Sequence, residues 1–164
     1  MKRFLYLFTA IIMLSSCGAA KSVSYTHRPL AAEGCSVSYS TVQNDDQIKI
    51  VVTVRSDRLV FGSNPMMMLK NFKGEVLKLE GVNSQSRSET ASVLVNNMVL
   101  PVNELNAMAE FPVAEKDIDF FASGISKVRL STIPLVHEKE FSRDIIGTYL
   151  FKSLSAANTS EESF

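Results

Sequence analysis

The first two-thirds of the chain alternates hydrophobic and polar residues with the period of a β-strand. The clearest case is the segment 47–55, with the sequence QIKIVVTVR. Alternation of this kind is typical of a strand with one buried face and one face in water. The hydrophobic residues at every second position are Ile48, Ile50, Val52 and Val54. The same period predicts strands at 37–42 and 105–111, and a short apolar run ends at Phe61.

A β-hairpin is predicted around the segment 71–74, which has the sequence NFKG. Residues 66–69 and 75–80 would form its two strands. A four-residue connection that ends in glycine suits a type I turn followed by a left-handed Gly74. The run Met66, Met67 and Met68 could line an adaptable apolar groove. It is more typical of a strand that fills the core, and this is the interpretation we favour.

Two segments before residue 105 do not follow the alternation clearly. Residues 83–90 (NSQSRSET) are polar throughout and predict a loop. Residues 91–102 (ASVLVNNMVLPV) are apolar on both sides of Asn96 and Asn97. They fit either one long strand or a tight hairpin, because asparagine tolerates a positive φ.

The period changes from two to that of a helix in the last third. Residues 114–123 begin with acidic side chains and end before Gly124, as a helix start and a helix C-cap do. Residues 125–132 predict a strand. A second helix is predicted over 138–157. Its hydrophobic stripe would be Phe141, Ile145 and Tyr149, flanked by Ile146, Leu150 and Leu154.

These elements predict an α+β fold. An antiparallel sheet of about six to eight strands would be covered on one face by two helices from the C-terminal third. The domain would span residues 35–157, followed by a disordered tail at 158–164. A chain of this length can bury a core without a metal or disulfide staple.

The N-terminal segment has the pattern of a secretory signal. Lys2 and Arg3 precede an apolar stretch at 4–14, which Thr9 alone interrupts. A membrane-spanning helix needs about 20 apolar residues, so this stretch is too short to be an anchor. No later segment is long and apolar enough to span a membrane. We therefore expect a cleaved signal peptide.

The end of this signal resembles the lipobox of bacterial lipoproteins. Leu14, Ser15, Ser16 and Cys17 match that family's pattern of an aliphatic residue, two small residues and an obligatory cysteine. The resemblance implies a signal peptide at 1–16 and lipidation of Cys17, which becomes the mature N-terminus. The alternative is an ordinary signal cut at the small residues Gly18, Ala19 and Ala20.

Lipidation would make the protein peripheral to a bilayer, held by acyl chains such as palmitate on Cys17. Residues 17–34 are small, polar and weakly patterned, and predict the lipidated cysteine followed by a flexible tether. Gly18 differs from the aspartate that retains some lipoproteins in the inner membrane. The resemblance therefore implies the outer membrane, with the domain facing the periplasm.

Composition and charge argue against some classes of function. The 164 residues include 46% hydrophobic and 21% charged side chains, with 17 basic and 17 acidic residues. Removal of residues 1–16 leaves 15 basic and 17 acidic residues, a charge of −2. Nucleic-acid binders usually carry a basic excess, so we expect no nucleic-acid partner. The apolar content and the charge balance also argue against a disordered tail protein.

Cys35 is the only other cysteine. A small buried hydrophobe at the start of a strand is the interpretation we favour. The alternatives are a nucleophile or a thiol that links two chains as a dimer. Cys35 and His137 could form a thiol–base pair, but about 100 residues separate them and no cysteine-protease signature surrounds Cys35.

The two histidines give no strong sign of a metal site. His27 lies in the predicted tether, where a fixed site is hard to hold. His137 lies at the start of the second predicted helix, with Glu138, Glu140 and Asp144 nearby. The spacing is not H-E-x-x-H, and a solvated helix start explains the acids equally well. No metal or cofactor is predicted.

Other chemistry is weakly indicated. The sequence contains no nucleophile elbow, dinucleotide-binding or phosphate-loop motif. Lys127 and Arg129, with Arg143 and Lys152, could form a basic strip for an acidic ligand. A solvated face whose charges pair with nearby acids is the simpler interpretation.

Residues 59–154 also resemble small uncharacterised lipoproteins of Bacteroidota-type bacteria, through segments such as FASGISKVRLST and FSRDIIGTYLFKSL. The resemblance implies domain identity and location and provides no site residues. Together these patterns predict a membrane-tethered, non-catalytic module of the cell envelope that binds an envelope partner through a sheet edge or an apolar groove. A periplasmic enzyme of unidentified type is the alternative.

Overall fold

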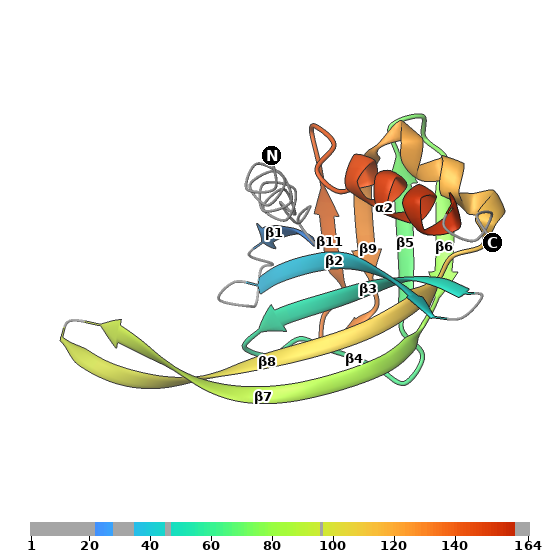
Figure 1. Cartoon of the computed structure of the whole chain (residues 1–164). Coiled ribbons are helices and arrows are strands. Elements are labelled where there is room, and N and C mark those ends of the chain that lie inside the picture. The colour runs from blue at the N-terminus through green and yellow to red at the C-terminus, as the bar shows by residue number, and fades with distance from the viewer. Residues whose placement is uncertain (1–21, 28–34, 45–46, 96, 160–164) are drawn as a thin grey trace, which may run out of the picture.

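The structure is a computed structural model that describes residues 22–27, 35–44, 47–95 and 97–159. Its elements form mostly antiparallel sheets, with two helices toward the C-terminal end (Figure 1). In chain order they are β1 (Val23–His27), β2 (Cys35–Asn44), β3 (Gln47–Ser56), β4 (Val60–Phe61), β5 (Met66–Asn71), β6 (Val76–Glu80), β7 (Val82–Val95), β8 (Met98–Pro112), the 3-10 helix η1 (Glu115–Ser123), β9 (Ile125–Leu130), β10 (Thr132–Ile133), β11 (His137–Glu140) and the α-helix α2 (Gly147–Thr159).

The larger sheet has five antiparallel strands in the order β1-β2-β3-β8-β7. In β2, β3 and β8, buried residues alternate with less buried ones. The buried residues are mostly hydrophobic and form the inner face of the sheet. The predicted alternation in 47–55 is confirmed, and so is the strand predicted at 105–111. The buried inner-face residues are Val37, Tyr39, Ile50, Val52, Val54, Ala107, Ala109 and Phe111.

The smaller sheet has four strands in the order β11-β9-β5-β6, and β4 pairs with β10 in a separate two-stranded sheet. Figure 1 shows the strands of the four-stranded sheet crossing those of the five-stranded sheet. One hydrophobic cluster joins the inner faces of both sheets and the helices. The smaller sheet contributes Met67, Leu69, Leu79, Val128 and Leu130, and α2 contributes Leu150 and Leu154.

The predicted α+β class agrees with this architecture, but the prediction of one sheet of six to eight strands is wrong. The described strands divide into sheets of five, four and two. Gly81, between β6 and β7, lies where the chain passes from the four-stranded to the five-stranded sheet. A Cβ atom there would lie 2.6 Å from the Glu110 carbonyl oxygen and from the Phe111 ring, so only glycine fits without displacement. Period-two alternation shows that a strand is half-buried but not which sheet it joins.

The first predicted helix exists as η1, a 3-10 helix. The predicted C-cap is confirmed, because Gly124 has a φ of 68° and its N–H donates to the Phe121 carbonyl at 3.0 Å. Ile118 and Phe121 share its buried face, as predicted.

The second predicted helix is wrong in its first half. Residues 137–140 form β11, which pairs with β9, and α2 begins only at Gly147. The buried stripe is Ile146, Leu150 and Leu154, the residues expected to flank it. Asp144 explains the late start, since its carboxylate accepts the N–H groups of Gly147 and Thr148 at 2.8 and 2.7 Å. An acidic side chain that accepts these free N–H groups fixes a helix start.

The hairpin predicted at 71–74 is confirmed, with Gly74 at a φ of 91°. The loop predicted at 83–90 is wrong, because these residues belong to β7. The strand-or-hairpin alternative for 91–102 resolves as a hairpin, in which β7 pairs with β8 and Asn97 has a φ of 63°. Polar residues gave no alternation by which β7 could be recognised.

Residues 23–27 fall inside the segment predicted as a tether, yet they form β1 and pair with β2. The domain therefore includes these residues. Cys17, the predicted signal peptide and most of the predicted tail lie outside the described residues, and α2 extends to Thr159. Within the described part of the chain, no helix is long and apolar enough to cross a membrane.

Candidate functional site

A buried cluster of polar side chains lies where β1, β2 and β11 meet. It consists of Tyr25 from β1, Cys35 and Tyr39 from β2, and His137 from β11. All four are buried, with His137 fully inaccessible and Cys35 4% exposed. The structure thus brings together Cys35 and His137, which sequence reasoning left apart.

The cluster is a continuous chain of hydrogen-bonding groups. The Tyr25 hydroxyl lies 3.0 Å from the Tyr39 hydroxyl and 3.0 Å from His137 Nε2. On the other side of the imidazole, Nδ1 lies 3.5 Å from Cys35 Sγ. A neutral imidazole has one N–H donor and one acceptor nitrogen, so it can bond both neighbours in either tautomer.

The strand register and a tight connection place these residues. In the β1–β2 pair, Val23 is opposite Tyr39 and His27 is opposite Cys35, so Tyr25 lies diagonally between the two β2 residues. His137 is held by its backbone N–H, which donates to Thr132 Oγ1 at 3.0 Å. For His27 the structure describes this backbone register, and its side chain lies outside the described part.

The electrostatics of the cluster keep its acidic groups protonated. Burial, followed by the nearby Asp57 charge, raises the pKa of the Cys35 thiol. Burial also raises the pKa of both Tyr25 and Tyr39. A low-dielectric surrounding disfavours the charged form of each group. At neutral pH the Cys35 thiol and the two phenols are therefore uncharged hydrogen-bonding groups.

This arrangement fits a structural role better than a thiol–base catalyst. The 3.5 Å separation of Cys35 Sγ and His137 Nδ1 is that of a nucleophile and its base. A reactive cysteine, however, has a lowered pKa and access to substrate, whereas this thiol is buried with a raised pKa. The same burial argues against Cys35 as the link in a disulfide-bonded dimer.

The acids beside His137 do not gather around it. Because 137–140 is a strand, His137 points into the core whereas Glu138 and Glu140 are exposed. Asp144 is occupied at the start of α2. Among the residues that the structure describes, no three His, Cys, Asp or Glu side chains lie close enough to hold a metal ion.

Lys127 and Arg129, two residues of the alternative basic strip, lie close to acidic residues on their own sheet. Lys127 forms ion pairs with Glu138 and, at 2.9 Å, with Glu140. Hydrogen bonds to these two acids raise the pKa of Lys127. Arg129 lies 3.9 Å from Glu138. The simpler interpretation, a solvated face whose charges pair with nearby acids, agrees with these contacts.

The methionine run is divided between the core, as favoured from the sequence, and the outer face of β5. Met67 is fully buried in the core. Met66 and Met68, on the opposite face of β5, line a shallow hollow of about 270 Å³ with Arg129, Ser131 and Val136.

The β7–β8 hairpin extends beyond the rest of the five-stranded sheet (Figure 1). β8 pairs with β3 only from Leu105 to Pro112, whereas its pairing with β7 continues out to Met98. Residues 89–95 and 98–104 thus form a two-stranded extension, which we call the arm. At 3.4 Å per residue the arm is about 20 Å long. Within the described strands it has no third strand beside it.

The arm is unusual in composition. Residues 90–103 contain no charged residue. The register pairs apolar with apolar at Ala91↔Val102, Val93↔Leu100, Leu94↔Val99 and Val95↔Met98. Successive strand positions alternate between faces, so apolar residue types occur at positions on both faces of the arm. Met98, beside the turn, is 61% exposed. An isolated two-stranded ribbon is marginally stable in water, so such an arm is suited to contact another surface.

Comparison with protein families, with curated proteins and with solved structures finds no match for this chain.

Proposed function

We propose that the chain is a membrane-tethered lipoprotein of the cell envelope, a non-catalytic module that binds an envelope protein through its β7–β8 arm. The observation that carries the binding role is the arm itself, a two-stranded extension with no charged residue from 90 to 103. Aromatic and aliphatic surfaces without charge are typical of the centres of protein interfaces.

The tether in this proposal rests on sequence. Leu14, Ser15, Ser16 and Cys17 follow a short apolar segment and two basic residues, as in lipoprotein signals. With acyl chains on Cys17, the domain would stand at the periplasmic face of the outer membrane. Five residues, 18–22, separate Cys17 from β1, so the domain would lie close to the bilayer.

The alternative of a periplasmic enzyme has one observation in its favour, the approach of Cys35 to His137. Its prediction is a thiol that reacts readily at neutral pH. A Cys17→Ser chain contains Cys35 as its only thiol. We expect a disulfide reagent to label it slowly in the native protein and rapidly in urea. Rapid labelling of the native chain would favour the enzyme.

The tether is tested by intact mass of the membrane-fraction protein, wild type against Cys17→Ser. We expect the wild type to begin at Cys17 and to be heavier by its acyl groups, and the variant to lack them. An unmodified wild type cut after Ala20 would overturn the lipoprotein proposal. The domain would then be a free secreted protein.

The arm is tested by photo-crosslinking in whole cells. A photoreactive amino acid replaces Met98 on the arm, or Val76 on β6 as the control. The two positions are 61% and 58% exposed, so accessibility is matched. We expect a discrete protein adduct at position 98 only. Equal adducts at both positions, or none at 98, would contradict the proposed role of the arm.

A further inference from the structure

A second surface, the outer face of the five-stranded sheet, carries a row of three polar residues from adjacent strands. Asn106 on β8 is directly opposite Arg55 on β3 and directly opposite Arg87 on β7. Neighbouring strands lie about 4.8 Å apart, so the two arginine backbones are about 10 Å apart. Both long side chains can therefore reach one small ligand above Asn106.

The row lines a shallow hollow of about 180 Å³. The next row along the strands supplies its other side, with Met108 opposite Thr53 and opposite Gln85. The hollow is lined by Thr53, Arg55, Gln85, Arg87, Asn106 and Met108. Except for Met108 these residues carry hydrogen-bonding groups. Val54 and Ala107, the neighbours of Arg55 and Asn106 along their strands, point into the core. The hollow therefore lies on the outer face of the sheet, because successive strand residues point to opposite faces.

Asn106 holds a buried acceptor without a donor. Its Oδ1 atom is inaccessible and has no hydrogen-bond partner within the described part of the chain. A buried polar atom left unpaired costs free energy, so such atoms are rare in folded proteins. Rotation of the Asn106 amide would turn Oδ1 toward the hollow, where a ligand hydroxyl could donate to it.

The charges of the row favour a singly charged anion. Neither Arg55 nor Arg87 has an acidic partner within 4.0 Å among the described residues, whereas Lys127 on the other sheet has two. Glu104 lies one row farther along β8, opposite Glu89 in the register. A carboxylate suits two arginine forks. A doubly charged phosphate would be repelled more strongly by the acidic row.

We propose that this hollow binds a sugar acid. Arg55 and Arg87 would hold the carboxylate, and a hydroxyl of the same sugar would donate to Asn106 Oδ1. Thr53 and Gln85 offer further partners for hydroxyl groups. The hollow has no deep apolar pocket for a peptide side chain, which favours a sugar over a peptide carboxylate. The site does not depend on the arm or on lipidation.

The test is a ligand-observed NMR titration of the purified full chain with galacturonate. Its methyl ester keeps the hydroxyl groups without the charge, and acetate keeps the charge without the hydroxyl groups. We expect galacturonate to bind at least tenfold more tightly than either, because only it makes both contacts. Equal binding of acetate would indicate an adventitious anion, and equal binding of the ester would remove the arginine role. Tighter binding of galactose 6-phosphate or of N-acetylalanine would also overturn the proposal.

Variants locate the site. Arg55→Gln and Arg87→Gln should each weaken galacturonate binding about tenfold, and Arg143→Gln, an exposed arginine before α2, should leave it unchanged. Glu104→Gln should tighten galacturonate binding about two- to threefold, because the substitution removes a repulsive charge. Thermal unfolding checks that each variant folds. Folded Arg55→Gln and Arg87→Gln variants that bind like the wild type would overturn the assignment.

Discussion

The two edges of the five-stranded sheet are held in opposite ways. β1 has only five residues, yet Tyr25 anchors it through Tyr39, His137 and contacts with the Phe141 ring. β7 has fourteen residues, but over its last seven its partner β8 no longer pairs with β3, so the two strands are held only by each other. The length of a strand therefore does not measure how firmly it is held. Burial against a second layer does, because apolar burial and satisfied hydrogen bonds supply the stability.

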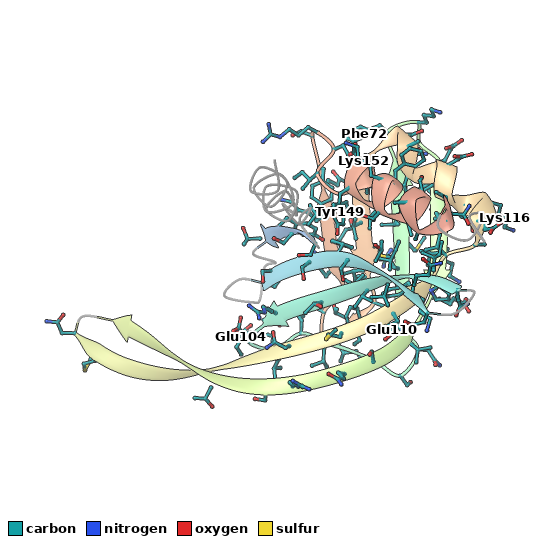
Figure 2. All side chains as sticks on the ribbon, in the orientation of Figure 1. Phe72, Glu104, Glu110, Lys116, Tyr149 and Lys152 are labelled. Atoms are coloured by element: carbon teal, nitrogen blue, oxygen red, sulfur yellow. The ribbon has the colours of Figure 1, made fainter. Side chains whose placement is uncertain are left out.

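The two edges also differ in what their residues could do. The β1 edge contains the Cys35–His137 pair, the arrangement that most resembles chemistry, but the core encloses it. The β7 edge contains no reactive group among the described residues. This edge is nevertheless open to contact with another molecule. Figure 2 shows side chains crowded between the sheets and the helices. The arm, in contrast, has no third strand beside it among the described strands. Binding elements are often drawn from such less stable regions.

The largest expected effect comes from His137. His137→Ala would leave the Tyr25 hydroxyl without one partner and open a cavity beside Cys35, which should lower the free energy of unfolding by about 3 kcal/mol. Chemical denaturation measures this. Tyr25→Phe keeps the ring and removes only the hydroxyl, so it should cost about 1–2 kcal/mol. A change near zero for both variants would mean that the cluster does not anchor the β1 edge.

An intermediate effect is expected at Asp144, which accepts N–H groups from Ile125, Gly147 and Thr148 and the Thr148 hydroxyl. Burial alone would raise its pKa, but these hydrogen bonds outweigh burial and lower it. Asp144→Asn should cost about 1 kcal/mol at neutral pH.

The pH dependence of this effect has a definite sign. Because the pKa of folded Asp144 is lowered, its stabilisation is complete above the unfolded-state pKa of about 3.9 and is lost as the pH falls through the folded value. The difference between wild type and Asp144→Asn in urea should therefore shrink between about pH 4 and pH 2. A difference that grows on acidification would contradict the assigned hydrogen bonds.

The smallest effect on stability is expected from the arm. Replacing residues 91–102 by Asn-Gly joins Thr90 to Asn103 with a turn that suits a two-residue hairpin. Because the arm pairs with no third strand in the described structure, the free energy of unfolding should change by less than about 0.5 kcal/mol. A large loss of stability would show that the arm belongs to the cooperative core.

Sequence reasoning found elements where side-chain periodicity matched burial. Ile48, Ile50, Val52 and Val54 reveal β3, and Gly74 and Gly124 mark turns that need a positive φ. It missed β7, whose polar residues carry no alternation, and β1, a short strand inside a weakly patterned segment. The alternation of Val23, Tyr25 and His27 was the available signal for β1.

Two candidate sites were hidden for the same reason. Tyr25 and His137 are 112 residues apart, and Arg55, Asn106 and Arg87 come from three separate strands. Neither set has a local motif, because the residues become neighbours only through strand pairing. The helix predicted from residue 138 was wrong because its hydrophobic spacing was judged without the Asp144 hydrogen bonds that set the start of α2.

The sequence by itself determined the local properties of this protein: the half-buried strands, the turns at glycine and asparagine, and the class of fold. These follow from the residues within a few positions of one another. Only the tertiary structure decided how the strands divide between sheets, that Cys35 meets His137 in a closed core, and that β7 and β8 extend past β3. These depend on register between distant strands, which local periodicity does not encode.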